Sequence, residues 1–150
     1  MGSWQKFRQL SSREKAWFVQ AYVLLPLTVF ALRLMGLRPW QSLLSRFLPP
    51  LPDSVGAFST ADAVVRMTNA AARRCYPFPN CLSRSVVLWW LLRRQGLPAE
   101  LRFGSVRQSG QLEAHAWVEV AGRPVDSSDT EFQRFTPLRD AAMSPEAKPR

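Results

Sequence analysis

Three side chains of this sequence have the types and the order that nucleophilic catalysis needs. Cys81 stands at the start of a predicted helix, His115 lies on a predicted strand, and Asp126 ends the strand after it. A cysteine thiolate can attack a carbonyl group, an imidazole can carry the proton, and a carboxylate can hold the imidazole in one tautomer. The sequence therefore predicts a nucleophile, a general base and an orienting acid.

The segment around Cys81 reads as a helix with clear ends. Asn80 is a suitable N-cap, and Gly96 followed by Pro98 stops the helix after Arg94. Unpaired backbone N–H groups and the helix dipole favour an anion at such a start, and hence a thiolate at Cys81. The alternative for Cys81 is a small buried residue that packs at a helix start. Between the two ends, Trp89 and Trp90 are predicted core residues.

His115 lies in a stretch whose residue types alternate between apolar and polar. Leu112 to Val120 reads as a strand that places His115, Trp117 and Glu119 on one face. A rigid strand beside an aromatic ring can hold and shield an imidazole. The alternative is an exposed strand histidine with no chemical role.

Asp126 is predicted to lie close to the histidine strand. The tight turn Ala121-Gly122 leads into a short strand over 123–126, which would put Asp126 opposite Trp117 and Val118. Its carboxylate could then accept a hydrogen bond from His115. Asp129 is the rival candidate, and either aspartate could instead cap the loop at Ser127-Ser128.

Three further residues could contact the reacting group or the substrate. Asn80 could add an oxyanion contact to the backbone N–H of Cys81, although an N-cap role alone would explain it. Arg84 could bind a substrate carboxylate or backbone, or could form a partly buried ion pair. Trp117 is a substrate-contact candidate because it shares the face of His115.

Two segments of the chain resemble the lasso-peptide leader peptidases of bacterial ribosomal-peptide biosynthesis. They are NCLSRS with LWWLLRRQG at 80–96, and AHAWVEV with Gly122 at 114–122; the resemblance covers roughly residues 59–129. It implies an α+β, transglutaminase-like (papain-like) fold in which a central Cys-bearing helix packs on a small antiparallel sheet. It also implies Cys81 as nucleophile, His115 as base and an aspartate shortly after the histidine strand, which favours Asp126 and leaves Asp129 open.

The same resemblance implies a cysteine peptidase without a cofactor that removes the leader from a precursor peptide. Some members of this family carry a fused leader-recognition domain, and the short apolar N-terminal part here does not resemble one. The expected partners are therefore the precursor's leader peptide, a separate leader-recognition protein and a lasso cyclase. The alternatives are transfer of the acyl group to an amine and a non-catalytic scaffold or membrane-surface module.

We expect three parts along the chain. Residues 1–52 are a helical, apolar N-terminal part with helices near 11–34 and 40–47, which ends in a proline-rich connector. Residues 53–140 are the catalytic core, with a helix near 59–74, the cysteine helix, and strands over 101–106, 112–120 and 123–126. Residues 141–150 are a frayed tail.

Composition limits the partners and the compartment. The net charge of +9 suits an acidic partner, but the chain has neither zinc-finger spacing nor an RNA-binding aromatic signature, so we expect no nucleic acid. Cys75 and Cys81 form no disulfide framework or metal knuckle, and His115 is the single histidine, so we expect no metal site and a cytoplasmic location. The apolar run over 16–34 favours a buried or membrane-surface helix over a spanning one, because Gln20, Pro26 and Arg33 interrupt it.

Overall fold

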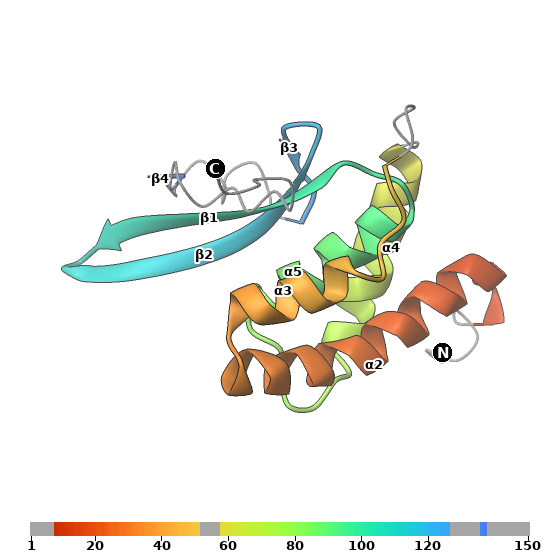
Figure 1. Cartoon of the computed structure of the whole chain (residues 1–150), viewed down its shortest axis with the longest axis horizontal. Coiled ribbons are helices and arrows are strands. Elements are labelled where there is room, and N and C mark those ends of the chain that lie inside the picture. The colour runs from red at the N-terminus through yellow and green to blue at the C-terminus, as the bar shows by residue number, and fades with distance from the viewer. Residues whose placement is uncertain (1–7, 52–57, 127–135, 138–150) are drawn as a thin grey trace.

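The computed structural model describes residues 8–51, 58–126 and 136–137. Within these ranges the chain forms helices first and strands afterwards: α2 (Ser12–Leu34), α3 (Leu37–Ser45), α4 (Phe58–Ala72), α5 (Cys81–Arg94), β1 (Ala99–Gln108), β2 (Gln111–Val120), β3 (Arg123–Pro124) and β4 (Thr136–Pro137). The strands form one antiparallel sheet in the order β3-β2-β1-β4, with the helices gathered beside one end of it (Figure 1). The predicted α+β class is confirmed.

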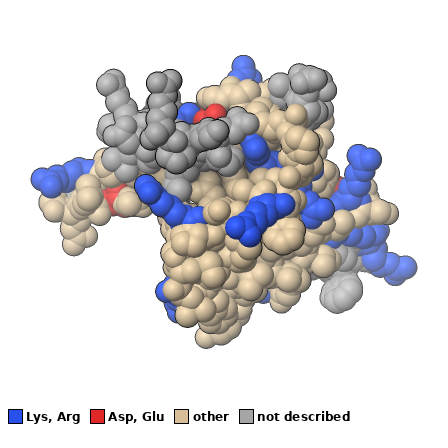
Figure 2. Space-filling model, viewed as in Figure 1, with Lys and Arg blue, Asp and Glu red and all other residues tan. Residues whose placement is uncertain are grey.

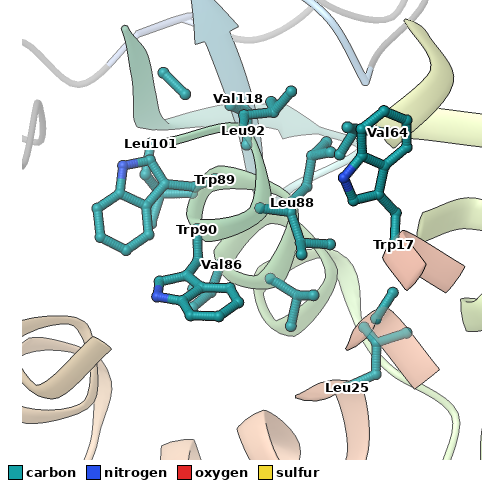
Figure 3. Close-up of a cluster of buried hydrophobic side chains, with 14 of the residues drawn as sticks. Trp17, Leu25, Val64, Val86, Leu88, Trp89, Trp90, Leu92, Leu101 and Val118 are labelled. Atoms are coloured by element: carbon teal, nitrogen blue, oxygen red, sulfur yellow. The ribbon is translucent and has the colours of Figure 1, made fainter. Parts of the chain in front are cut away.

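Helix α5 is the centre of the hydrophobic core. Every residue from Ser85 to Leu92 is buried, and the helix contacts α2, α3, α4, β1 and β2. Figure 3 shows Leu88, Trp89 and Trp90 pointing away from α5 in different directions, toward side chains from α2 and the sheet. The indole of Trp90 also donates a hydrogen bond to the carbonyl of Leu44 in α3, at 3.0 Å. The prediction that both tryptophans belong to the core is confirmed, and the core includes the N-terminal helices.

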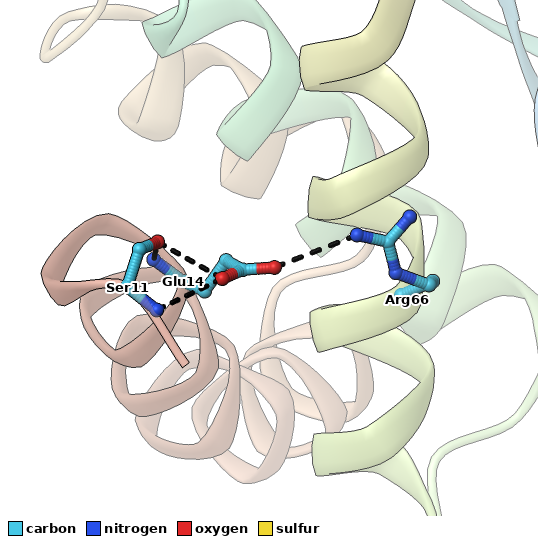
Figure 4. Close-up of polar contacts among 3 residues, drawn as sticks. All are labelled: Ser11, Glu14 and Arg66. Atoms are coloured by element: carbon cyan, nitrogen blue, oxygen red, sulfur yellow. Dashed lines mark hydrogen bonds and ion pairs between the residues drawn. The ribbon is translucent and has the colours of Figure 1, made fainter. Parts of the chain in front are cut away.

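Helix α2 begins with a complete capping box. The side chain of Ser11 accepts a hydrogen bond from the N–H of Glu14, and the carboxylate of Glu14 accepts one from the N–H of Ser11. The same carboxylate lies 3.4 Å from the guanidinium of Arg66 in α4 (Figure 4). These bonds to Ser11 hold the pKa of Glu14 below its usual range. Farther along, Trp17, Ala21 and Leu25 face the core, so α2 packs against α4 and α5 over much of its length.

Two tight hairpins build the sheet. The turns at Ser109-Gly110 and Ala121-Gly122 have positive φ at both positions, which is the geometry of a two-residue hairpin that follows the natural strand twist. The first turn sets the register that places His115 opposite Gly104. The predicted strands are therefore present, although the first is longer than expected and runs from Ala99 to Gln108.

Several element boundaries differ from the predicted ones. Helix α3 begins at Leu37 instead of Trp40, because Pro39 falls in the first turn, where a missing N–H has no intrahelical bond to lose. Helix α4 covers Phe58–Ala72, close to the predicted 59–74. Strand β4 was not predicted; it pairs with Gly104 and Ser105 at the far edge of β1. Residues 52–57 and the predicted tail 141–150 lie outside the described residues.

Candidate active site

The first turn of α5 carries Cys81. Asn80 is the N-cap: its side-chain oxygen accepts hydrogen bonds from the N–H of Ser83 at 2.8 Å and from the Ser83 hydroxyl at 3.0 Å. Cys81 is the first helical residue and is half-buried. Its own N–H and that of Leu82 have no acceptor within the helix, since intrahelical bonding begins with Arg84, which donates to Asn80. The predicted N-cap role of Asn80 is confirmed, and the helix start offers an anion two backbone donors.

His115 lies in the middle of β2 and is half-buried. Its ring stacks on the indole of Trp117, with centroids 6.2 Å apart and planes 19° apart. The indole N–H donates to Glu119 at 3.0 Å, and the other carboxylate oxygen of Glu119 accepts from Arg102 at 3.1 Å. The hydrogen bonds from Arg102 to Glu119 and from Trp117 to Glu119 therefore hold the indole that stacks on His115.

The structure corrects the prediction for Trp117. Its side chain is completely buried, so no part of the indole is open to a substrate. Strand alternation correctly placed Trp117 on the face of His115, but alternation does not say whether that face is covered. Trp117 supports the imidazole and is not a substrate contact in this structure.

Asp126 lies beside β2 at the predicted place. The N–H of Val125 donates to the carbonyl of Val118, and the N–H of Val118 donates to Oδ1 of Asp126 at 2.9 Å. The carboxylate thus continues the hairpin hydrogen bonds two residues past the end of β3. Its second oxygen, Oδ2, accepts a hydrogen bond from the hydroxyl of Ser85 in α5, at 3.1 Å.

Ser85 was not singled out from the sequence, and it joins the elements of the site. Its hydroxyl lies 3.0 Å from the carbonyl oxygen of Ala116, the residue after His115, and its side chain is completely buried. Ser85 follows Cys81 by four residues, so the two lie on the same face of α5, one turn apart. One hydroxyl therefore ties the cysteine helix both to the histidine strand and to Asp126. In the sequence, the one sign of this role was a polar serine next to the apolar run of the predicted cysteine helix.

The electrostatics of this region centre on Asp126. Burial raises the pKa of its carboxyl group, and the Val118 N–H, the charge of Arg84 and the Ser85 hydroxyl each oppose that rise. Arg84 is half-buried, and its Nε makes no hydrogen bond in the part of the chain that the structure describes. Its charge acts on Asp126 through space and lowers the pKa of that carboxyl group. The two predicted roles of Arg84, a substrate contact and a partly buried ion pair, both stay predictions. Asp129, the rival third residue, lies outside the described residues.

The second cysteine has a different environment. Cys75 is buried in the hydrophobic core, with its sulfur 4.0 Å from the carbonyl oxygen of Tyr22, and burial raises the pKa of its thiol. Between residues 8 and 137, leaving out the undescribed ranges, no three His, Cys, Asp or Glu side chains gather in a way that could hold a metal ion. Of the two thiols, the one at the start of α5 is the less buried.

A comparison with known families agrees with this arrangement. The family model described as transglutaminase-like superfamily matches residues 24–140. The chain belongs to the transglutaminase-like superfamily. Members of this superfamily are generally cysteine-dependent enzymes, among them peptidases and acyltransferases. The transglutaminase-like match contains Cys81, His115 and Asp126, and it begins inside α2. Comparisons with curated proteins and with solved structures give no match.

Proposed function

We propose that this transglutaminase-like chain is a cysteine peptidase that removes the leader from a ribosomally made lasso-peptide precursor. The observation that carries the proposal is the position of the Ser85 hydroxyl, which lies on the helix of Cys81 within hydrogen-bond distance of both the Ala116 carbonyl in the strand of His115 and the carboxylate of Asp126. The segments 80–96 and 114–122 resemble those of leader peptidases and direct the choice among the chemistries of the superfamily.

In the proposed reaction, the Cys81 thiolate attacks the carbonyl carbon of the bond between leader and core. The Cys81 N–H donates to the oxyanion that forms, at the start of α5. His115 gives its proton to the leaving amine as the C–N bond breaks, which leaves the leader as a thioester on Cys81. His115 then takes a proton from water, whose oxygen attacks the thioester and releases the thiolate. Asp126 fixes the orientation of the imidazole through both steps.

The substrate would be brought to this site by other proteins. The described N-terminal part consists of α2 and α3, which pack into the core of the same domain. We propose that a separate leader-recognition protein delivers the precursor in the cytoplasm. The freed core amino terminus would pass to a lasso cyclase.

The test is reconstitution of the chain with a leader-recognition protein and a candidate precursor, followed by mass spectrometry. We expect a free leader that has gained one water and a free core peptide. Cys81→Ala should abolish the cut, whereas Cys75→Ala should keep it, because Cys75 lies in the core away from the helix start. Equal cleavage by Cys81→Ala would refute the peptidase proposal. A leader that carries an added amine would assign the chain to acyl transfer instead.

A further inference from the structure

The outward face of α2 is an exposed apolar surface. Six large apolar side chains at helical spacing form it, and we call them the α2 apolar face: Val19, Tyr22, Val23, Leu27, Phe30 and Leu34. Leu34 is 84% exposed, Val23 59% and Phe30 53%. At a rise of about 1.5 Å per residue the face is about 22 Å long. A continuous apolar patch of this kind marks a binding surface, since single exposed apolar residues would need no explanation.

The apolar surface continues into the loop ahead of α5. Tyr76 and Phe78 are among the most exposed aromatic side chains of the described residues. Their rings pack edge to face, with the ring centroids 6.4 Å apart. The preceding residue, Cys75, contacts the backbone of Tyr22 in the middle of α2. The two aromatic residues therefore lie in the loop between the residue that contacts α2 and the residue that begins α5.

The opposite face of α2 is buried in the core of the protein. By length and composition α2 could cross a membrane, but Ala21 and Leu25 are completely buried in the core. A spanning position would pull both residues away from α5. The helix is therefore suited to lie along a surface, with one side in the protein core and the other outward.

Basic side chains stand at both ends of the α2 apolar face. Arg8 and Arg13 are exposed at its start, and Arg33 and Arg38 are exposed at its end. Residues 1–52 contain a single acidic residue, Glu14, against the basic residues Lys6, Arg8, Arg13, Lys15, Arg33, Arg38 and Arg46. Figure 2 shows the lower edge of the molecule, where Figure 1 places α2, as mostly uncharged surface with Lys and Arg side chains at its right end.

We propose that the α2 apolar face docks the protein on an anionic lipid surface. The apolar side chains would enter the boundary between head groups and acyl chains, while the arginines at both ends would meet lipid phosphates. A second copy of this chain is a poorer occupant, because two such faces would bring their arginines together. The proposal needs no peptidase activity, so it can fail or succeed independently of the proposed function.

The test is flotation of the full chain with phosphatidylcholine vesicles that contain or lack phosphatidylglycerol. We expect binding to the anionic vesicles that weakens with added salt, and little binding to the neutral ones. Leu27→Glu and Phe30→Glu should each release the protein. Leu112→Glu, at a more exposed apolar position on the far hairpin, should leave binding unchanged. Arg33→Gln and Arg38→Gln should each weaken binding about fivefold.

Cys81→Ala should bind the vesicles like the wild type, which separates docking from catalysis. Because the substituted side chains are exposed, circular dichroism melting should show the same folded state in all variants. Equal binding to neutral and anionic vesicles, or no binding to either, would overturn the proposal. Self-association that Phe30→Glu abolishes, without vesicle binding, would assign the face to contact between copies instead.

Discussion

The hydroxyl oxygen of Ser85 lies 3.1 Å from Oδ2 of Asp126 and 3.0 Å from the carbonyl oxygen of Ala116. When Asp126 is ionised, both neighbours are acceptors, and the single hydroxyl hydrogen can satisfy only one of them at a time. When Asp126 is protonated, it can donate to Ser85, which donates to Ala116. Burial raises the pKa of Asp126, and the hydroxyl of Ser85 opposes that rise.

Ser85→Ala should destabilise the fold and slow the proposed cleavage. The variant leaves two buried acceptors without their hydroxyl partner, which costs about 1–3 kcal/mol in free energy of unfolding. It also frees α5 from the strand of His115, and we expect cleavage to fall by up to about a hundredfold because catalytic geometry is sensitive to small displacements. Urea unfolding and the cleavage assay measure the two effects.

The matched control for Ser85 is Ser45→Ala. Ser45 is also a helical serine, and its hydroxyl bonds only to the carbonyl of Gln41 in its own helix. Its loss should cost less than 1 kcal/mol and leave cleavage intact. If Ser85→Ala proved as mild as Ser45→Ala, the link between helix and strand would have no energetic role.

Asp126→Asn should keep the fold and lose activity. The amide oxygen can accept from the Val118 N–H, and the amide nitrogen can donate to Ser85, so both contacts survive. The neutral amide cannot stabilise an imidazolium, and we expect cleavage to fall by about 10³–10⁴-fold. Asp126→Ala should lose both stability and activity.

Asp129→Asn is the comparison that decides between the two aspartates. If it abolishes cleavage while Asp126→Asn stays active, Asp126 is a structural residue and the third catalytic position belongs to Asp129. Thermal melting of both variants separates loss of fold from loss of chemistry.

The raised pKa of Asp126 also predicts how stability depends on pH. The folded state holds the proton more tightly than the unfolded chain, whose carboxyl titrates near its ordinary value of 3.8. Between that value and the higher folded pKa, the folded state binds more protons, so this group lowers stability as pH rises. Asp126→Asn should remove that contribution, which urea unfolding from pH 3.5 to 7 can measure. A difference between the two proteins that stays constant across this range would contradict the raised pKa.

Alkylation should distinguish the two cysteines. Cys81 is half-buried at a helix start, whereas Cys75 is buried and its thiol pKa is raised. In the folded chain, iodoacetamide should modify Cys81 first, and Cys75 should react only after denaturation. Peptide mass spectrometry after timed quenching gives both rates. Equal rates in the folded chain would mean that the helix start gives Cys81 no advantage.

Local signals in the sequence were enough to predict the helices and hairpins. Ser11 and Asn80 mark helix starts through their own side-chain caps, and Ala121-Gly122 marks a hairpin whose register brings Asp126 to Val118. These features depend on residues within a few positions of one another. They are therefore readable without the tertiary structure.

The contacts that complete the site depend on how distant elements pack. Ser85 and Ala116 are far apart in the chain, and their contact depends on the angle at which α5 crosses the sheet. The burial of Trp117 likewise depends on what covers its face, and β4 is a two-residue strand with no alternation to reveal it. Periodicity can place a side chain on a face, but it cannot identify the neighbour across the interface.

The shared core gives the N-terminal helices a role in maintaining the reaction centre. Trp17, Ala21 and Leu25 close one side of α5, and Leu44 accepts the indole hydrogen bond of Trp90. A fragment that began at residue 53 would leave that side of α5 facing water and would strip the cysteine helix of its support. Helices α2 and α3 therefore support the helix that carries Cys81, and a chain shortened to its sequence motifs would lose the packing that holds those motifs in place.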